Sequence, residues 1–140
     1  MRHGMGLRAP GVFALLIAAQ AAHSVEEYVF RLYDVLAPAR FVSGLLSTDP
    51  SVGFALANAA VVLFGVWCCR ARVWPGHRSW RGWAWFWVVL ETGNGIGHGL
   101  LALSRGGYFP GVGTAPLLLA LALSLGVVLL RDANGARPSP

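Results

Sequence analysis

The sequence predicts an all-α integral membrane protein, a single domain over residues 1–140 built as a bundle of four transmembrane helices. Three observations predict this class. Hydrophobic residues make up 56% of the chain and charged residues only 12%, about half of the roughly 25% charged residues in a typical soluble domain. Long apolar runs recur along the chain. Arginines flank these runs and form no stripe with base-stacking aromatics, which argues against nucleic-acid binding.

Each apolar run is close to the roughly 20 residues that a helix needs to cross a bilayer. The expected spans are residues 11–31, 53–69, 82–103 and 114–130. Between them we expect an extramembrane loop, a basic loop and a turn-rich connection, followed by a flexible tail; these are residues 34–52, 70–81, 104–113 and 131–140.

Two of these segments need further interpretation. The basic start, apolar stretch and AQAA site before His23 also describe a secretory signal peptide. Cleavage there would leave His23 at a new N-terminus and separate it from the pattern described below, so we favour a retained span. In the first loop, one helical face collects apolar side chains and favours a short interfacial helix; these are Phe41, Val42, Leu45 and Leu46.

The arginines predict the orientation in the membrane. Four spans place both termini on one side, and eight of the eleven arginines fall on that side: Arg2, Arg8, Arg70, Arg72, Arg78, Arg81, Arg131 and Arg137. The other side receives Arg31, Arg40 and Arg105. Because cytoplasmic loops carry the excess of basic residues, this distribution predicts cytoplasmic termini and a multi-pass protein of the plasma (inner) membrane. All six tryptophans lie between Trp67 and Trp87, as expected of an aromatic belt at the cytoplasmic interface.

Ionisable side chains lie inside two of the expected spans. In the first span, His23, Glu26 and Glu27 are spaced i, i+3 and i+4 and share one side of a helix. Each ionisable group at membrane depth costs about 2.5–3.5 kcal/mol on insertion scales. A chain that keeps three together therefore indicates a site of chemistry or ligation.

The third span repeats this pattern with Glu91, Asn94 and His98 at i, i+3 and i+7. Counted at 1.5 Å per residue, the two sets reach similar depth in the outer half of the bilayer. Since membrane helices turn ionisable groups toward one another and away from lipid, we expect one shared cluster that faces the extracytoplasmic side.

Structural roles remain open for several of these residues. Glu27 and Arg31 are i, i+4 and can pair at a helix end, and Glu26 can reach the outer headgroups. His98 and Asn58 can form hydrogen bonds between helices. Gly93 and Gly97 form a GxxxG pattern, which either permits close helix packing or makes room for a ligand.

Three motifs in order resemble the HXXEE family, which consists of small, mainly bacterial integral membrane proteins without an established activity. The motifs are His23-Ser24-Val25-Glu26-Glu27, the later histidine His98, and Tyr108-Phe109-Pro110-Gly111. The resemblance extends from the first span to the start of the fourth. It supports the membrane class and the choice of residues, and it implies no reaction.

From these residues we expect a membrane-embedded enzyme that acts on a lipidic or isoprenoid-like substrate. His23 and His98 with Glu26 or Glu27 form a His₂-carboxylate set, which suits one divalent metal, Zn²⁺ or Fe²⁺. The remaining glutamate or Glu91 is then the general base. The residues expected to contact the substrate are Asn94 and Tyr108.

Other functions use the same cluster. A metal-free enzyme would use His and Glu as acid and base for isomerisation or cyclisation. An ion or metal carrier, or a membrane ligand-binding protein, would use the cluster as its binding site, and a homodimer would supply the missing wall of a transport path. In a structural subunit the cluster would serve to hold helices together.

Overall fold

Four long helices dominate the fold, which was analysed as a computed structural model that describes residues 9–135. They are α1 (Ala9–Val29), α4 (Pro50–Cys68), α5 (Trp80–Arg105) and α6 (Ala115–Gly135). Within residues 9–135 there is no strand, so the all-helical class is confirmed. Arg2, Arg8 and Arg137, which entered the orientation argument, lie outside the described residues.

Two of the four helices meet the length and hydropathy that a membrane crossing requires. They are the segments Pro50–Val73 and Ala115–Asn134. This finding indicates membrane association on length and composition, and a crossing by all four helices remains a proposal. The helix ends also differ from the expected spans. In particular, α6 continues to Gly135, so its last turn includes the start of the tail expected at residues 131–140.

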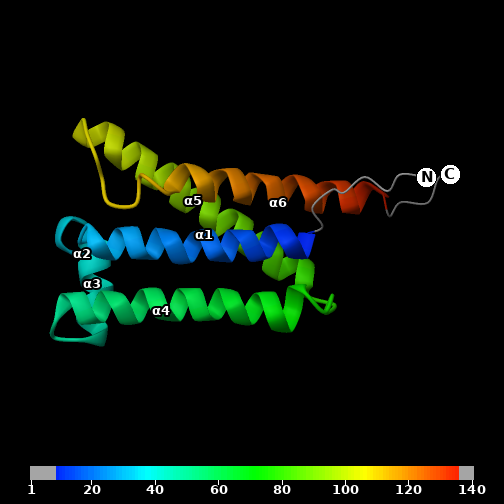
Figure 1. The fold of residues 1–140 in the computed structure, drawn as a ribbon, viewed down its shortest axis with the longest axis horizontal. Helices are drawn as coiled ribbons and strands as arrows, with labels where there is room; N and C mark the ends of the chain where they lie inside the picture. The colour runs from blue at the N-terminus through cyan, green and yellow to red at the C-terminus, as the bar shows by residue number, and fades with distance from the viewer. Residues whose placement is uncertain (1–8, 136–140) are drawn as a thin grey trace.

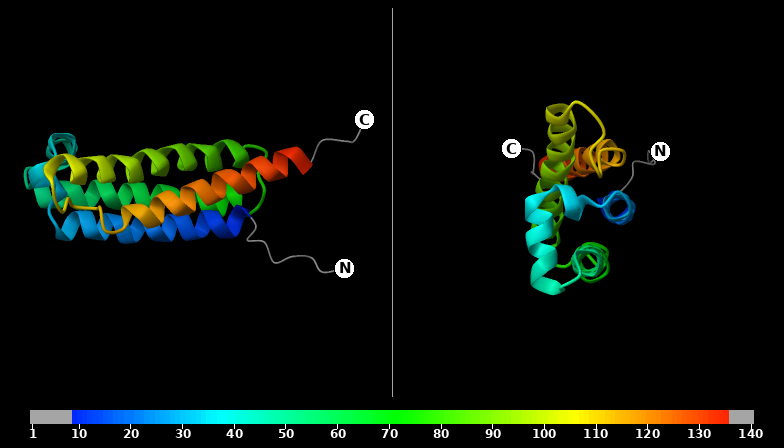
Figure 2. Two further views of the ribbon diagram at one scale, coloured as in Figure 1. Left: turned by 90° about the horizontal axis from the view of Figure 1, so that it is seen from above. Right: turned by 90° about the vertical axis from the view of Figure 1, so that its left-hand side faces the viewer.

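The helices are arranged so that α1 lies in the middle of the bundle. Figure 1 shows α1 between α4 and α6, with α5 crossing diagonally behind it, and Figure 2 shows the same packing from above and from one end. The start of α1, the end of α6 and the α4–α5 connection share one end of the bundle. The short helices α2 (Leu32–Val35) and α3 (Ala37–Leu46) and the α5–α6 loop share the other end.

Local sequence signals explain several of the helix ends. Asp49 caps α4, because its carboxylate accepts from the backbone N–H of Ser51 at 2.8 Å and Pro50 follows it at the first helical position. Gly106 ends α5 in the left-handed conformation, with φ of 67°. At the basic end of the bundle, α4 leads into a π-helical turn, η1 (Cys69–Val73), before the loop to α5.

The core lies along α1 at the end that carries the tryptophans. Phe13 and Leu16 are fully buried there, and Phe13 packs edge-on against Trp87 of α5 with ring centroids 6.3 Å apart. Trp87 is itself fully buried, so this tryptophan belongs to the core and not to an interfacial belt. Trp67 and Trp74 are exposed and fit the expected belt.

The apolar face expected in residues 34–52 lies on α3, which confirms a helix in that loop. Phe41 and Leu45 are both 69% exposed, and Val42 and Leu46 are exposed beside them. The opposite face of α3 holds the buried Ser43, whose hydroxyl donates to the carbonyl of Ala39 at 2.7 Å. The apolar face of α3 therefore points away from the bundle.

A single glycine permits the close crossing of α3 and α4. A Cβ atom added at Gly53 would lie 2.0 Å from the backbone oxygen of Ser43 and 2.7 Å from its carbonyl carbon. These neighbours are backbone atoms, so they cannot move aside as a flexible side chain can. Gly53 is thus required for the contact between the two helices.

We expect Gly53→Ala to lower the free energy of unfolding by about 1–3 kcal/mol, the usual cost of overpacking. The matched control is Gly44→Ala, because a Cβ at this exposed position of α3 meets no atom within 4 Å. Alanine there should be neutral or stabilising by up to about 1 kcal/mol, since it favours the helix. Titration of the purified protein from mild detergent into a denaturing one measures both. Equal stability of the two variants would contradict the crossing.

Candidate metal centre

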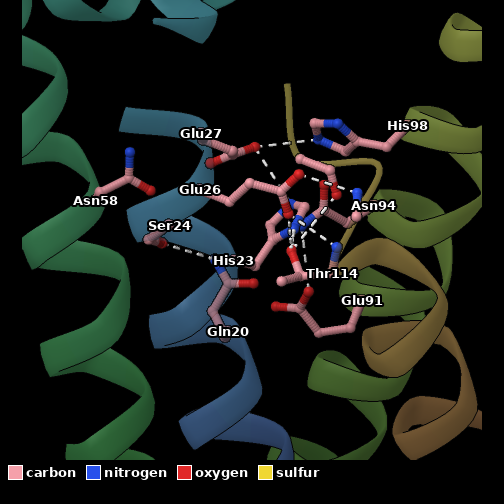
Figure 3. A network of polar contacts seen from close by, with 12 residues as sticks. Gln20, His23, Ser24, Glu26, Glu27, Asn58, Glu91, Asn94, His98 and Thr114 are labelled. Carbon is pink, nitrogen blue, oxygen red and sulfur yellow. Dashed lines mark hydrogen bonds and ion pairs between the residues drawn. The ribbon is translucent and has the colours of Figure 1, made fainter. Parts of the chain in front are cut away.

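Three buried side chains converge between α1 and α5. His23 Nε2 and His98 Nε2 lie 3.3 and 3.0 Å from the same atom, Oε1 of Glu27. One donor atom from each residue lies within 4.8 Å of the others. The rings of the two histidines meet edge to face with centroids 4.7 Å apart. The cluster (Figure 3) joins residues 75 positions apart in the sequence and could hold a metal ion.

Hydrogen bonds fix which nitrogen of His23 carries a proton. The hydroxyl of Thr114 lies 2.6 Å from Glu26 Oε2 and donates to it, since a carboxylate only accepts. Thr114 Oγ1 also lies 2.7 Å from His23 Nδ1. With its own hydrogen committed to Glu26, the hydroxyl accepts there, so Nδ1 of His23 carries the proton. In the neutral ring, Nε2 therefore presents a lone pair toward Glu27.

This arrangement places two acceptors opposite each other. His23 Nε2 is buried and makes no hydrogen bond within the described part of the chain, although Glu27 Oε1 lies 3.3 Å away. A lone pair and a carboxylate oxygen at this distance repel each other unless a proton or a metal ion lies between them. The site could therefore hold a cation, either a proton or a metal ion.

Glu26 has a different role, because both of its oxygens are already used. The carboxylate accepts from the Tyr108 hydroxyl at 2.5 Å, from the backbone N–H groups of Gly113 and Thr114 at 2.9 and 2.8 Å, and from the Thr114 hydroxyl. Gly113 and Thr114 stand directly before the start of α6, where free N–H groups attract a negative charge. Glu26 fastens α1 to the start of α6 and is not a member of the ligand cluster.

The segment from Tyr108 to Thr114 closes over the two histidines. Gly111 has φ of 93° and lies so close that an added Cβ would be 2.6 Å from His98 Nδ1 and 2.8 Å from His23 Cε1. Phe109 is fully buried and lies beside the His98 ring, with centroids 5.7 Å apart. A glycine is needed at position 111 both for the positive φ and for the approach of the backbone to the imidazoles.

Glu91 lies in a second polar group next to the cluster. It is 1% exposed and accepts from Asn94 Nδ2 at 3.2 Å. The amide orientation of Gln20 that satisfies all partners places its nitrogen 3.0 Å from Glu91 Oε2 and its oxygen 3.2 Å from the hydroxyl of Ser24. Neutral amides thus surround this carboxylate, and no arginine contacts it among residues 9–135.

The structural alternatives are not equally supported. Arg31 pairs with Asp34 at 2.6 Å, so the expected Glu27–Arg31 ion pair is absent within the described part of the chain. Asn58 donates within its own helix, to the carbonyl of Phe54 at 3.4 Å, and makes no bond across helices in residues 9–135.

The glycines of α5 differ in whether they contact another helix. A Cβ at Gly93 or Gly97 would meet nothing within 4 Å. The close approach occurs at Gly95, where an added Cβ would lie 2.9 Å from Leu119 Cβ of α6. The GxxxG packing prediction was therefore wrong, and the room left at Gly93 agrees with the alternative of space for a ligand.

Sequence reasoning missed Gln20, Gly111 and Thr114 as parts of the site. The spacing could have indicated Gln20, because it lies at i−3 from His23 and i−7 from Glu27 on the same helical face. Thr114 had a weaker signal, since a threonine directly before a helix is a typical cap. Neither signal identifies the partner, because Thr114 is 91 positions from His23.

These features define a class: all-helical proteins in which two helices bring a His₂-carboxylate cluster together under a glycine-containing loop. The chain belongs to the family described as proteins of unknown function with an HXXEE motif, and the family model matches residues 14–125. The match includes both histidines, all three glutamates of the site and the loop above them. No curated protein matches the chain, and no solved structure does.

The contact between Glu26 and Tyr108 leads to a pH prediction. Partial burial and the hydrogen bond to Glu26 raise the pKa of Tyr108 to about 12, from an ordinary value of 10.0. A raised pKa means that the folded state favours the protonated phenol. The stabilisation is therefore fully present below pH 10 and is lost as the pH rises to about 12.

We expect Glu26→Gln to return the pKa of Tyr108 toward 10.0 and to destabilise the fold by about 1–3 kcal/mol, because donors at the start of α6 lose their ionised acceptor. Phenolate absorbance during a pH titration measures the first effect, with Tyr108→Phe identifying the signal. An unchanged titration in Glu26→Gln would show that the two side chains do not interact in solution.

Proposed function

We propose that this protein is a metal-dependent enzyme of the plasma membrane that acts on a lipidic or isoprenoid-like substrate. In this proposal α1, α4, α5 and α6 all cross the membrane, with cytoplasmic termini. The site lies in the extracytoplasmic half. The proposal rests on one observation above all, the buried Nε2 of His23 that faces a carboxylate without a hydrogen bond of its own.

The membrane part of the proposal is supported by exposed apolar side chains and by charge. Large hydrophobic residues are exposed on every long helix, among them Val29, Leu63, Val89, Leu103 and Leu130. Such a surface is costly in water and favourable in lipid. The basic loop between α4 and α5 lies at one end of the bundle, and Arg31, Arg40 and Arg105 lie toward the other, as the positive-inside rule requires.

The two distances between Glu27 and the histidine nitrogens fit a divalent ion. Ligand atoms about 2.0–2.1 Å from a tetrahedral Zn²⁺ are roughly 3.3–3.4 Å from one another. Glu27 Oε1 lies 3.3 and 3.0 Å from the two histidine nitrogens. The Nδ1 proton of His23, held by Thr114, leaves Nε2 free as a ligand. Metal-ligating histidines commonly donate their other ring N–H to a neighbouring oxygen in this way.

A His₂Glu set leaves coordination positions open, and Zn²⁺ or Fe²⁺ bound there would polarise a substrate oxygen or lower the pKa of a bound water. The chain itself supplies the proton transfer. Glu91 is the candidate general base, because it lines the same groove as Glu27 and only neutral amides hold it. Asn94 shares that groove and orients Glu91, whereas Tyr108 supports the loop through Glu26.

A metal carrier or a ligand-binding protein built on the same cluster is the alternative. The two classes of protein differ in how fast the bound metal ion exchanges with ions in water. A carrier must release its ion to water on both sides, whereas an enzyme retains it. His23 is fully buried and His98 is 5% exposed, and Gly111 covers both imidazoles, which favours retention. Slow exchange of bound zinc with added radioactive zinc would support the enzyme, and rapid exchange would support the carrier.

Metal content is the direct test. Protein purified in detergent without chelators should contain about one Zn or Fe per chain, and His23→Ala or His98→Ala should reduce this at least tenfold. The control is His77→Ala, because His77 lies in the basic loop and bonds Arg72 and Ser79 away from the cluster. Absence of metal from the wild-type protein, before and after reconstitution, would refute the metal site.

The orientation is tested with single cysteines in a variant that lacks Cys68 and Cys69, which are buried and free. Ser104→Cys, at the exposed end of α5, should react with a membrane-impermeant maleimide in intact cells. Ala133→Cys, at the exposed end of α6, should react only after permeabilisation. The reverse pattern would invert the topology, and equal labelling from one side would exclude the four-span arrangement.

A further inference from the structure

Next to the cluster, a groove of about 570 Å³ opens on the side of the bundle between α4 and α5. Polar side chains form its inner part: Gln20, Glu27, Asn58, Glu91 and Asn94. Its outer walls are apolar and include Val61 of α4 with Val89 and Leu90 of α5. An amphiphile that entered sideways would thus place a polar group against Glu27 and Glu91 and its apolar part between the helices.

The diagonal course of α5 explains why a groove forms here. At the tryptophan end, aromatic contacts hold α4 and α5 together, with Phe64 beside Trp83 and Trp87 at centroid distances of 5.6 and 6.0 Å. Toward the other end α5 passes behind α1 and approaches the start of α6 (Figure 1). The two helices therefore diverge at the depth of the cluster. Gly93, which carries no side chain, widens the groove further.

The chemistry of the groove limits what it accepts. Two carboxylates and three amides line it, and none of its described lining residues is basic. A phosphate or carboxylate headgroup would meet the Glu91 carboxylate without a cation to pair with, because neither histidine of the proposed metal site lines the groove. Such a contact is unfavourable at low dielectric constant. A hydroxyl or an amine can donate to the same oxygens. Glu91 is the best partner, because Oε1 of Glu27 already faces the two histidine nitrogens at 3.3 and 3.0 Å.

We propose that this groove is a lateral entry site for an apolar chain that ends in a hydrogen-bond donor, a hydroxyl or an amine, and that it rejects phosphorylated lipids. This assignment builds on the proposed function by naming the substrate class of that site. It stands on the groove and its charges, and binding in the groove does not itself require the metal.

The test uses the full chain in nanodiscs of a zwitterionic lipid, with radiolabelled hexadecylamine, hexadecanol and hexadecyl phosphate as probes. We expect saturable binding of the amine and the alcohol, and at least tenfold weaker binding of the phosphate. Gly93→Leu should weaken amine binding at least tenfold, because the new side chain fills the groove. Gly99→Leu is the matched control, since Gly99 lies outside the groove and an added Cβ meets nothing within 4 Å.

Two further measurements separate this inference from the metal proposal. Glu91→Gln should reduce binding of the amine more than binding of the alcohol, because it removes a charge and keeps an acceptor. Metal content is measured in the same samples, and Gly93→Leu should retain it. Equal binding of phosphate and amine, or unchanged binding in Gly93→Leu, would overturn the groove assignment whatever the metal content. A metal-free protein that still binds the amine selectively would overturn the metal site alone.

Discussion

The fastening of α1 to the start of α6 is the contact on which the site depends. Glu26 accepts four hydrogen bonds from Tyr108, Gly113 and Thr114, and Thr114 in turn holds the Nδ1 proton of His23. One carboxylate therefore caps a helix, positions a loop and sets the tautomer of a histidine. The two adjacent glutamates of the motif therefore have different roles. Glu26 organises the structure around the site, and Glu27 faces the two imidazoles.

This division explains how so many polar groups are accommodated in an apolar bundle. An unpaired ionisable group at membrane depth costs several kcal/mol, so each must find a partner. Glu27 lies against His23 and His98, and Glu91 is held by Gln20 and Asn94. Two imidazole nitrogens are the exceptions in this network: Nε2 of His23, which has an acceptor opposite it, and Nδ1 of His98 make no hydrogen bond within the described residues. Buried polar atoms without a partner are rare in native structures, and a bound ion is one arrangement that would satisfy them.

The sequence was sufficient for the helical class and for much of the cluster. Helical spacing places His23 and Glu27 on one face of α1. Counting the rise per residue along each helix places His98 at a similar depth in the bundle. Both predictions follow from local helix geometry. The spacing did not separate Glu26 from Glu27, since they are neighbours whose roles depend on a loop 80 and more residues away. The spacing also did not identify Gly95 as the glycine that packs against α6. The rotation of α5 about its own axis decides whether Gly93, Gly95 or Gly97 faces α6, and the sequence does not specify this rotation. The groove was not predictable, since it arises from the tilt of α5.

The central claim is that His23, Glu27 and His98 bind one metal ion together. X-ray absorption spectroscopy at the metal edge of the purified, metal-loaded protein tests it most directly, because imidazole rings give characteristic outer-shell scattering. We expect two imidazole ligands with the remaining ligands oxygen, falling to one imidazole in His98→Ala. A first shell of oxygen alone, or sulfur ligands from Cys68 and Cys69, would contradict it.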